Sequence, residues 1–586
     1  MAFPPSELSR PNMRSSRTAI PVSFLLPLVL GCASAPSSSP TVATVESRSY
    51  QGPPTAAAIT PGDLKTRLYI FADDSMRGRA AGTADNLRGA AYIERELRRL
   101  GLEPGGDNGT YFQDVPLTSR RIGTDAGLTI GGRTFRPVTD FVPRDNGRGM
   151  RSVNGVTAIY GGTWGDSSTL ISNAAATGKF VVLSVPPGGW SVNRSAANLR
   201  FSSAAGIAMV SFDRMPVETR SSLVGESVGA PADQTMQPSP IPSFFYVSDE
   251  LARSLFNGST LSSLKPGATG GTLQGEAGYQ PGKPFPGRNV IAILRGSDPQ
   301  LRNEYVALGA HNDHLRVAPI AVDHDSLRAF NTVAKPEGAE SGDPQVTPAQ
   351  WVRIRAIRDS LRRLRPPRPD SIMNGADDDG SGSMAVLEIA EAFAKSGVRP
   401  KRSLLFVWHT GEEIGLVGSE YFTDHPTVPR DSIVTQLNID MIGRGGSDDA
   451  VHMNGDKPVY GNPNFVEVIG SRRLSTELGN LIDDVNRRQS APLEFSGVFD
   501  ANGEPHQMYC RSDHYEYARY GIPIAFFFTS VHRDYHQVTD EPQYIDYNHY
   551  SRIVNLIRDI ADRVANLDHR PVVDKPKPDP NGSCMQ

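Results

Sequence analysis

Cysteine and net charge are both scarce in this chain. The 586 residues include 3 Cys, which excludes a small scaffold built on disulfides. The 60 Lys and Arg residues nearly balance the 64 Asp and Glu residues, and the net charge of −4 argues against a nucleic-acid partner held by bulk charge. With 38% hydrophobic residues and 56 Gly and 46 Pro, the composition is that of a loop-rich globular protein rather than a disordered or fibrous one.

The N-terminal apolar segment is too short to cross a membrane. The uncharged run Thr18–Gly31 is typical of the apolar core of a secretory signal, and Met13, directly before Arg14, is the expected start of translation. The run ends at Cys32 in a stretch that resembles a bacterial lipoprotein cleavage box, although Val29 stands where that box prefers Leu. We predict a signal peptide over residues 1–32 and a lipid anchor on Cys32 that attaches an exported protein to the cell envelope, which means the outer membrane or periplasm if the cell is Gram-negative. An ordinary cleaved signal, with secretion, is the alternative.

Residues 33–60 are rich in Ser, Thr, Ala and Pro, a composition that predicts a disordered linker. Folding is expected to begin near Thr60, because Thr60-Pro61-Gly62-Asp63 is typical of a capped helix start. Residues 566–586 are expected to form a C-terminal tail.

The segment 126–280 has short apolar runs between Gly-rich turns, which predicts a small β-rich domain. Three such runs are 180–185, 206–211 and 242–247. The pattern resembles the protease-associated domain that is often inserted into exopeptidases. A carbohydrate-binding or purely structural β-domain is the alternative.

Residues 61–125 and 281–565 are predicted to form one α/β domain, doubly wound, with a mixed sheet that is mostly parallel at its centre and flanked by helices. Its four buried strands are expected at Val306–Ala310, Leu404–Trp408, Leu437–Ile439 and Ile524–Phe528, and they alternate with helical stretches. Ligands of such folds bind at the carboxyl ends of the strands. The candidate site residues follow those strand ends.

Two of the candidate motifs lie on either side of a long intervening segment. His311 follows the first strand, and Asp313 is placed to orient its imidazole; an ordinary surface loop is the alternative. Asp377, Asp378 and Asp379 stand together in a Gly-rich turn, and repulsion among adjacent carboxylates implies a bound cation. A Ca²⁺ loop is the rival explanation, but such loops space their oxygens alternately and close with a distant Glu.

The other motifs add ligand-type residues near further strands. Glu412 and Glu413 follow the second strand, Asp440 follows the third, and His536 lies beyond the fourth. Together the motifs supply two His, two Asp and one Glu, with a second Glu to spare. That set is suited to two divalent ions of the zinc type, bound by N and O atoms and sharing one carboxylate.

The ordered motifs resemble those of the secreted and lipoprotein dizinc aminopeptidases of the transferrin-receptor-like metallopeptidase family. The resemblance covers residues 61–125 and 281–565, and it implies a peptide substrate and two Zn²⁺ per chain. It implies that Asp378 bridges the ions, that His311 and Asp440 complete one site, and that Glu413 and His536 complete the other. It further implies that Glu412 is the general base, that Tyr535 stabilises the tetrahedral intermediate, and that Arg511 holds the substrate main chain.

The chain departs from that family in two places. Asp379 stands where relatives usually have Asn, which adds a negative charge near the bridge. The segment 315–370 is an insertion between His311 and Asp378, with a basic helix that is either a substrate-shaping lid or a solvated addition. The remaining histidines near the motifs, among them His314, are expected to support the ligands or the core.

Three questions stay open at this stage. Cys510 and Cys584 either form a disulfide that attaches the tail to the body or remain free thiols, and free thiols are slightly preferred. A glutaminyl-cyclase-like acyltransferase with one zinc, or a carboxypeptidase of the same family, is the alternative enzyme. A receptor without catalytic activity is disfavoured, because Glu412 and every expected ligand are present.

Overall fold

The computed structural model describes residues 49–123, 125–144, 150–187, 192, 194–223, 227–229, 241–276, 279–342, 344–454, 457–582, 584 and 586. The predicted signal peptide, Cys32 and the first part of the predicted linker lie outside the described residues. None of the helices within the described ranges combines the length and apolarity needed to span a bilayer.

A ten-stranded mixed sheet forms the centre of the domain that was predicted over 61–125 and 281–565. Within the described residues its order is β21 (Glu494–Ser496), β20 (Phe465–Ile469), β22 (Ile524–Phe528), β17 (Ile433–Ile439), β13 (Tyr305–His311), β16 (Ser403–His409), β12 (Tyr279–Leu294), β2 (Phe112–Ile122) and β9 (Ser227–Gly229), with β1 (Glu103–Pro104) beside β12. The strands β22, β17, β13 and β16 are parallel to one another. Beyond them each strand is antiparallel to its neighbour: β12 pairs with β16, β2 with β12, and β9 with β2. The predicted fold class, a doubly wound α/β domain with a parallel-centred mixed sheet, is confirmed.

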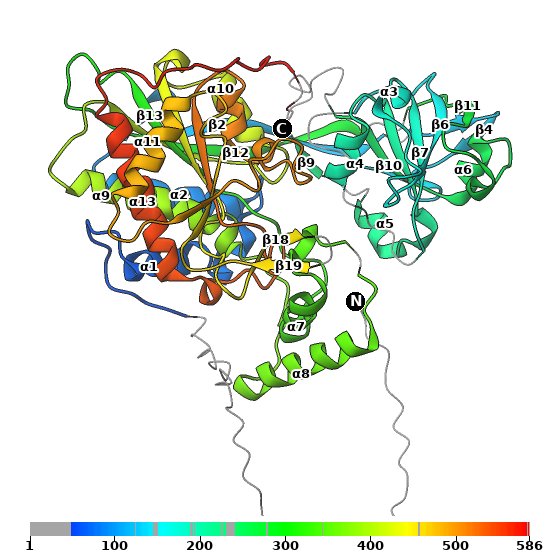
Figure 1. The fold of residues 1–586 in the computed structure, drawn as a ribbon, viewed down its shortest axis with the longest axis horizontal. Coiled ribbons are helices and arrows are strands. Elements are labelled where there is room, and N and C mark those ends of the chain that lie inside the picture. The colour runs from blue at the N-terminus through cyan, green and yellow to red at the C-terminus, as the bar shows by residue number, and fades with distance from the viewer. Residues whose placement is uncertain are drawn as a thin grey trace, which may run out of the picture. The chain divides into compact units, whose positions relative to one another are not determined.

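Side-chain alternation along the central strands fills a core on each face of this sheet. In β13, Val306 and Leu308 enter one core and Tyr305 and Ala307 enter the other. The first core is covered by α1 (Pro61–Phe71), α2 (Ala84–Leu100), α9 (Gly382–Lys395), α11 (Thr476–Arg487) and α13 (Tyr547–Ala565). Figure 1 shows α11 and α13 side by side. The second core is covered by α10 (Val417–Asp424) and α12 (His514–Ala518). The central strands are therefore buried on both faces, which explains their continuous apolar runs.

The segment predicted as β-rich contains helices as well as strands. Its six-stranded sheet has the order β11 (Thr269–Thr272), β6 (Thr157–Thr163), β7 (Phe180–Ser184), β8 (Gly206–Val210), β10 (Ser243–Val247) and β5 (Phe141–Arg144), and β6, β7, β8 and β10 are parallel. Parallel neighbours need crossover connections, and these include α3 (Asn173–Ala176), α4 (Arg194–Arg200) and α5 (Val217–Leu223) (Figure 1). A fourth helix, α6 (Asp249–Leu255), follows β10, the last of the parallel strands. Because β12 begins at Tyr279 and β9 pairs with β2, the boundary between the segment and the ten-stranded sheet lies inside shared strands.

Smaller elements complete the fold. They are the pairs β3 (Leu128–Ile130) with β4 (Arg133–Phe135), β14 (Val322–Asp323) with β15 (Pro369–Asp370), and β18 (Ala450–Asn454) with β19 (Lys457–Tyr460), the insertion helices α7 (His324–Ala334) and α8 (Pro348–Leu364), and the short helices η1 (Asp74–Arg79), η2 (Asp107–Gly109), η3 (Phe212–Arg214), η4 (Leu261–Ser263), η5 (Gly338–Glu340), η6 (Ala376–Ser381), η7 (Arg430–Ser432), η8 (Met508–Cys510) and η9 (Pro542–Tyr544).

Both ends of the described chain are attached to the α/β domain. Tyr50, within the predicted linker, packs on Tyr69 with ring centroids 5.5 Å apart, and Thr55 donates a hydrogen bond to Glu391. The part of the linker from 49 to 60 is therefore packed against the domain rather than free, because its aromatic and hydroxyl groups find partners there. At the other end Cys510 and Cys584 form a disulfide, so the preference for free thiols was wrong.

Candidate metal centre

Three parallel strands bring ligand-type side chains to one edge of the sheet. His311 is the last residue of β13, Glu412 and Glu413 follow the end of β16, and Asp440 directly follows β17. Since parallel strands have their carboxyl ends at the same edge, residues far apart in sequence meet there. His311, Asp440 and Glu413 are buried or nearly so.

Asp378 reaches this edge from the turn that precedes α9. Gly375 begins the turn with φ of +56°, a left-handed conformation that favours glycine. The Asp540 carboxylate accepts hydrogen bonds from the backbone N–H groups of Asp377 and Asp378, at 3.0 and 3.1 Å. These contacts fix the turn, so Asp378 is held in place by a segment 162 residues away in sequence.

Asp379, expected to add charge near the bridge, binds backbone instead. Its carboxylate accepts N–H groups of His311 at 3.1 Å, Gly382 at 2.7 Å and Met441 at 3.3 Å. Burial, with Asp440 nearby, raises its pKa well above the usual value. Asp379 therefore joins the ends of β13 and β17 to α9.

The first group of facing ligand atoms is the His311 cluster, formed by His311, Asp378 and Asp440. His311 Nε2 lies 3.2 Å from Asp378 Oδ1 and 3.7 Å from Asp440 Oδ1. The other ring nitrogen, Nδ1, lies 3.0 Å from the backbone oxygen of Asp313, and Ser512 donates a hydrogen bond to Asp440 Oδ2. These contacts leave His311 Nε2 and Asp440 Oδ1 facing each other.

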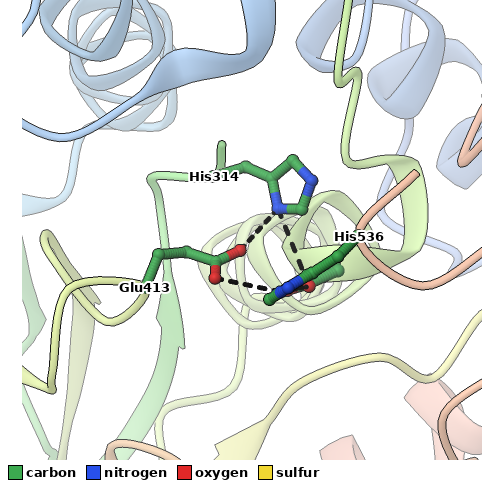
Figure 2. Close-up of side chains that lie close together, drawn as sticks. His314, Glu413 and His536 are labelled. Carbon is green, nitrogen blue, oxygen red and sulfur yellow. Dashed lines mark ion pairs between the residues drawn. The ribbon is translucent and has the colours of Figure 1, made fainter. Parts of the chain in front are cut away.

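The second group is the His314 cluster, formed by His314, Asp378, Glu413 and His536. His536 Nε2 lies 3.0 Å from both Asp378 Oδ2 and Glu413 Oε2, and His314 Nδ1 lies 2.6 Å from Glu413 Oε1 (Figure 2). Asp378 directs one oxygen to each cluster, as the expected bridging carboxylate requires. His314, expected among the supporting histidines, was missed as a ligand-type residue; its place in the same strand-end turn as His311 was the available signal.

The donor set fits divalent cations. Among the described residues, the buried atoms without a hydrogen-bond partner include His311 Nε2, His314 Nδ1, Asp378 Oδ2, Glu413 Oε1 and Asp440 Oδ1. Leaving such atoms unpaired is costly, and a cation between them removes that cost. Nitrogen and oxygen donors without sulfur suit zinc-type ions.

The same atoms perturb the histidine protonation. Burial alone would lower the pKa of His536, but the Glu413 and Asp378 carboxylates outweigh it and raise that pKa well above the usual value. The pKa of His311 is also raised, since Asp440 and Asp378 outweigh its burial. Both clusters therefore attract positive charge strongly.

Glu412 lies beside the His311 cluster, with Oε2 4.0 Å from His311 Nε2. Burial raises the pKa of Glu412 well above its usual value; His311 opposes this shift, and Glu413 adds to it. A carboxylate with a raised pKa beside a metal centre is suited to accept a proton at neutral pH.

Asp313 acts differently from the expectation. Its Oδ1 is 3.8 Å from His311 Nδ1 but accepts hydrogen bonds from the N–H groups of Gly411 at 2.7 Å and Glu412 at 3.2 Å. Burial raises its pKa to about 7. The carboxylate therefore holds the turn that carries Glu412, and the imidazole contacts the backbone oxygen of residue 313 instead.

Arg511 and Tyr535 form a polar pair next to the centre. Arg511 Nη2 lies 3.2 Å from the Tyr535 hydroxyl and 2.5 Å from Glu340 Oε1, which belongs to the insertion. Arg511, expected to hold the substrate main chain, is thus paired with Glu340 through one nitrogen, while its buried Nη1 has no hydrogen-bond partner among the described residues.

The two halves of the insertion differ in their surroundings. In α7, Arg328 pairs with Asp534 at 2.6 Å, and Asn331 donates to the backbone oxygen of Arg533, in the loop that carries Tyr535 and His536. Among the described residues of α8, Ile354 alone is buried. The part with α7 and η5 therefore borders the metal centre, whereas α8 is largely solvated.

A third group of ligand-type residues lies where the insertion meets the domain. It comprises His324, Asp370 and Glu541. Arg368 pairs with both Asp370 and Glu541, and His324 Nε2 lies 2.9 Å from Glu541 Oε2. These carboxylates already have cationic partners, so the group is an ion-pair network that attaches the insertion.

The other histidines near the motifs lie in supporting contacts. His409 Nε2 is 2.9 Å from the Tyr517 hydroxyl, and His532 Nε2 is 3.1 Å from Asp377 Oδ2. His514 stacks on Phe526, and burial lowers its pKa to about 3.

Comparison with known proteins shows what this centre is similar to. Residues 289–561, which contain both clusters and span somewhat less than half of the chain, match the sequence profile of peptidase family M28. That match supports the predicted peptidase class for this stretch of the chain. The transferrin-receptor-like subtype and the protease-associated identity of residues 126–280 stay predictions.

Individual relatives match the chain over shorter stretches. Leupeptin-inactivating enzyme 1 of Streptomyces exfoliatus is 46% identical over 77 residues, which are 13% of this chain and 18% of that protein. A probable leucine aminopeptidase of Trichophyton verrucosum is 31% identical over 115 residues, 19% of this chain and 32% of that protein. A solved zinc aminopeptidase of Bacillus subtilis aligns with 86% of this chain and 95% of its own, at 16% identity and a TM-score of 0.42. The chain thus matches less than a third of the length of these two sequence relatives.

Proposed function

We propose that the protein is a dizinc aminopeptidase that removes N-terminal residues from peptides. The observation that carries the proposal is the convergence of the His311 and His314 clusters on the shared Asp378, with Glu412 beside them. The match to peptidase family M28 supports peptide hydrolysis, and the relative named a probable leucine aminopeptidase supports cleavage at the N-terminus.

The ligands suit this chemistry. His311 and Asp440 would hold one ion, Glu413 and His536 the other, and Asp378 both. Two bound divalent ions lower the pKa of water and polarise the scissile carbonyl. Glu412 accepts the proton of the attacking water and delivers it to the leaving amine, a role that its raised pKa favours.

Arg511 and Tyr535 are placed to bind the oxygen that becomes negative during attack. The Tyr535 hydroxyl and the unpartnered Arg511 Nη1 are donors held near the clusters, and Glu340 fixes the Arg511 side chain. Donors fixed in advance stabilise developing charge without reorganisation. A carboxylate of the site would bind the free α-amino group, which makes the enzyme an exopeptidase.

Hydrolysis of aminoacyl and N-blocked chromogenic substrates, with and without chelator, tests this proposal. We expect chelator-sensitive cleavage of free N-termini only; equal cleavage of blocked substrates contradicts the aminopeptidase assignment. Glu412→Gln should lower kcat by about 10²- to 10⁴-fold while two ions per chain remain bound. Glu494→Gln, on the exposed edge strand β21, is the matched control. One ion per chain would favour the glutaminyl-cyclase-like alternative.

Export and lipid anchoring of Cys32 are proposed on separate grounds. The Cys510–Cys584 disulfide supports an oxidising compartment outside the cytoplasm, where such bonds persist. Detergent phase partitioning of the mature protein tests the anchor. We expect the wild-type protein in the detergent phase and Cys32→Ser in the aqueous phase. Retention of partition in that variant would exclude this anchor.

A further inference from the structure

His314 faces two carboxylates from inside the second cluster. Both of its ring nitrogens are buried and lack a hydrogen-bond partner among the described residues. Yet Nδ1 lies 2.6 Å from Glu413 Oε1 and 3.7 Å from Asp378 Oδ2. The Nδ1 atom therefore forms an ion pair with Glu413 and faces a second carboxylate, inside a group of four ligand-type side chains, which is the position of a metal ligand.

We propose that His314 is a fourth protein ligand of the ion held by Asp378, Glu413 and His536, so that the two metal positions are unequal. The proposal rests on the proposed dizinc function and adds that one ion is enclosed by protein while the other keeps an open position.

The separations between ligand atoms can be compared with those around one ion. Ligand atoms about 2.0–2.2 Å from one tetrahedral ion lie roughly 3.3–3.6 Å apart. In the His314 cluster the measured separations are 2.6 Å and 3.7 Å from His314 Nδ1, and 3.0 Å from His536 Nε2 to each carboxylate. Figure 2 shows the His314 ring facing one oxygen of the Glu413 carboxylate and the His536 ring facing the other. Around such an ion the three shorter separations would lengthen by roughly 0.3–1.0 Å.

The turn of Asp378 is shaped to seat the His314 ring. A Cβ at position 375 would lie 2.5 Å from Cδ2 and Cγ of that ring, so only glycine leaves room for it. The same turn positions Asp378. His514 makes a useful contrast, because within the described part of the chain its ring stacks on Phe526, 4.5 Å away, and no ion pair between its nitrogens and a carboxylate is found.

The two clusters then differ in ligand number. The His311 cluster has three protein ligands, the number typical of a catalytic zinc with a fourth position for water or substrate. The His314 cluster has four, as in a closed site. Glu412 lies next to His311, beside the open position, which is where a general base is needed. The enclosed ion would hold Asp378 in place, and it should leave more slowly and bind more tightly.

The test measures bound zinc per chain by mass spectrometry during titration with a competing chelator. In the wild-type protein we expect two classes of ion, and His311→Gln should keep the tight class. His314→Gln should weaken the tight class at least about tenfold, as loss of ligand support commonly does. His514→Gln, which also removes a buried imidazole, is the matched control and should keep both classes. A single class in the wild type, or unchanged classes in His314→Gln, overturns the proposal.

A second measurement does not depend on the variants folding. In crystals of the wild-type protein with zinc, the anomalous signal should place one ion about 2.0–2.1 Å from His314 Nδ1. An ion farther than about 3 Å from that atom overturns the proposal. Absence of bound zinc from the wild type would instead contradict the proposed function, so the two failures are distinguishable.

Discussion

Asp313 should stabilise the catalytic turn through hydrogen bonds rather than through its charge. Its Oδ1 accepts the N–H groups of Gly411 and Glu412, and Asp313 is completely buried. Asp313→Ala leaves both donors without that acceptor, and each such loss costs about 1–3 kcal/mol. The free energy of unfolding should therefore fall by about 2–6 kcal/mol, provided that the turn cannot rearrange to find water.

Asp313→Asn is the matched control, because it removes the same charge and keeps an acceptor oxygen. Urea unfolding of both variants at one fixed zinc concentration measures the difference, and bound zinc is measured alongside. We expect Asp313→Asn to be the more stable by most of that amount, with His311 still able to bind its ion, since the His311 ring contacts the backbone oxygen of residue 313. Equal stability of the two variants would refute the role of the hydrogen bonds.

Three further predictions concern other parts of the α/β domain. Burial raises the pKa of Glu467 from 4.5 to about 7, so the folded protein binds a proton that the unfolded chain releases; the stability that this group contributes is fully present below pH 4.5, and about 3 kcal/mol of it is lost as the pH rises through 7. In unfolding at pH 4.5 and pH 8, the decrease in stability should be about 3 kcal/mol smaller in Glu467→Gln than in the wild type, and equal decreases would contradict the assignment. The disulfide joins residues 74 apart, so Cys584→Ser should lower the free energy of unfolding by about 2–5 kcal/mol in denaturant titration; no change would mean that the tail contributes nothing. Glu340→Gln removes the charged partner of Arg511 and should raise KM for peptides, whereas Arg355→Ala, at an exposed position of α8, should not; identical KM values in the two variants would show that the insertion does not shape the site.

Much of the fold follows from local sequence signals. The four central strands were predicted because each is a short, continuous apolar run, and such runs arise when both faces of a strand are buried. The parallel order of the inserted sheet was not predicted, because the pairing of β7 with β8 depends on contacts between distant segments. The helices between them were also missed, since Gly-rich turns there obscured the helical pattern.

The candidate site divides in the same way. His311, Asp378, Glu413, Asp440 and His536 were predicted because each ligand-type residue stands close to a strand end or in the turn before a buried helix. His314 was placed among supporting residues; its position in the same turn as His311 was a signal, but a three-residue spacing does not show which way a second imidazole points. The contact that decides its role, 2.6 Å to Glu413, exists only after β13 and β16 pair.

The sequence by itself determined the chemistry available to this protein: the donor types, their order along the chain and the strand ends that present them. Tertiary structure decided which donors face one another, which carboxylate binds backbone, and that Arg511 pairs with Glu340, 171 residues away. The physical reason is that strand pattern and residue type depend on neighbours in sequence. Distances between side chains depend on how separate segments pack.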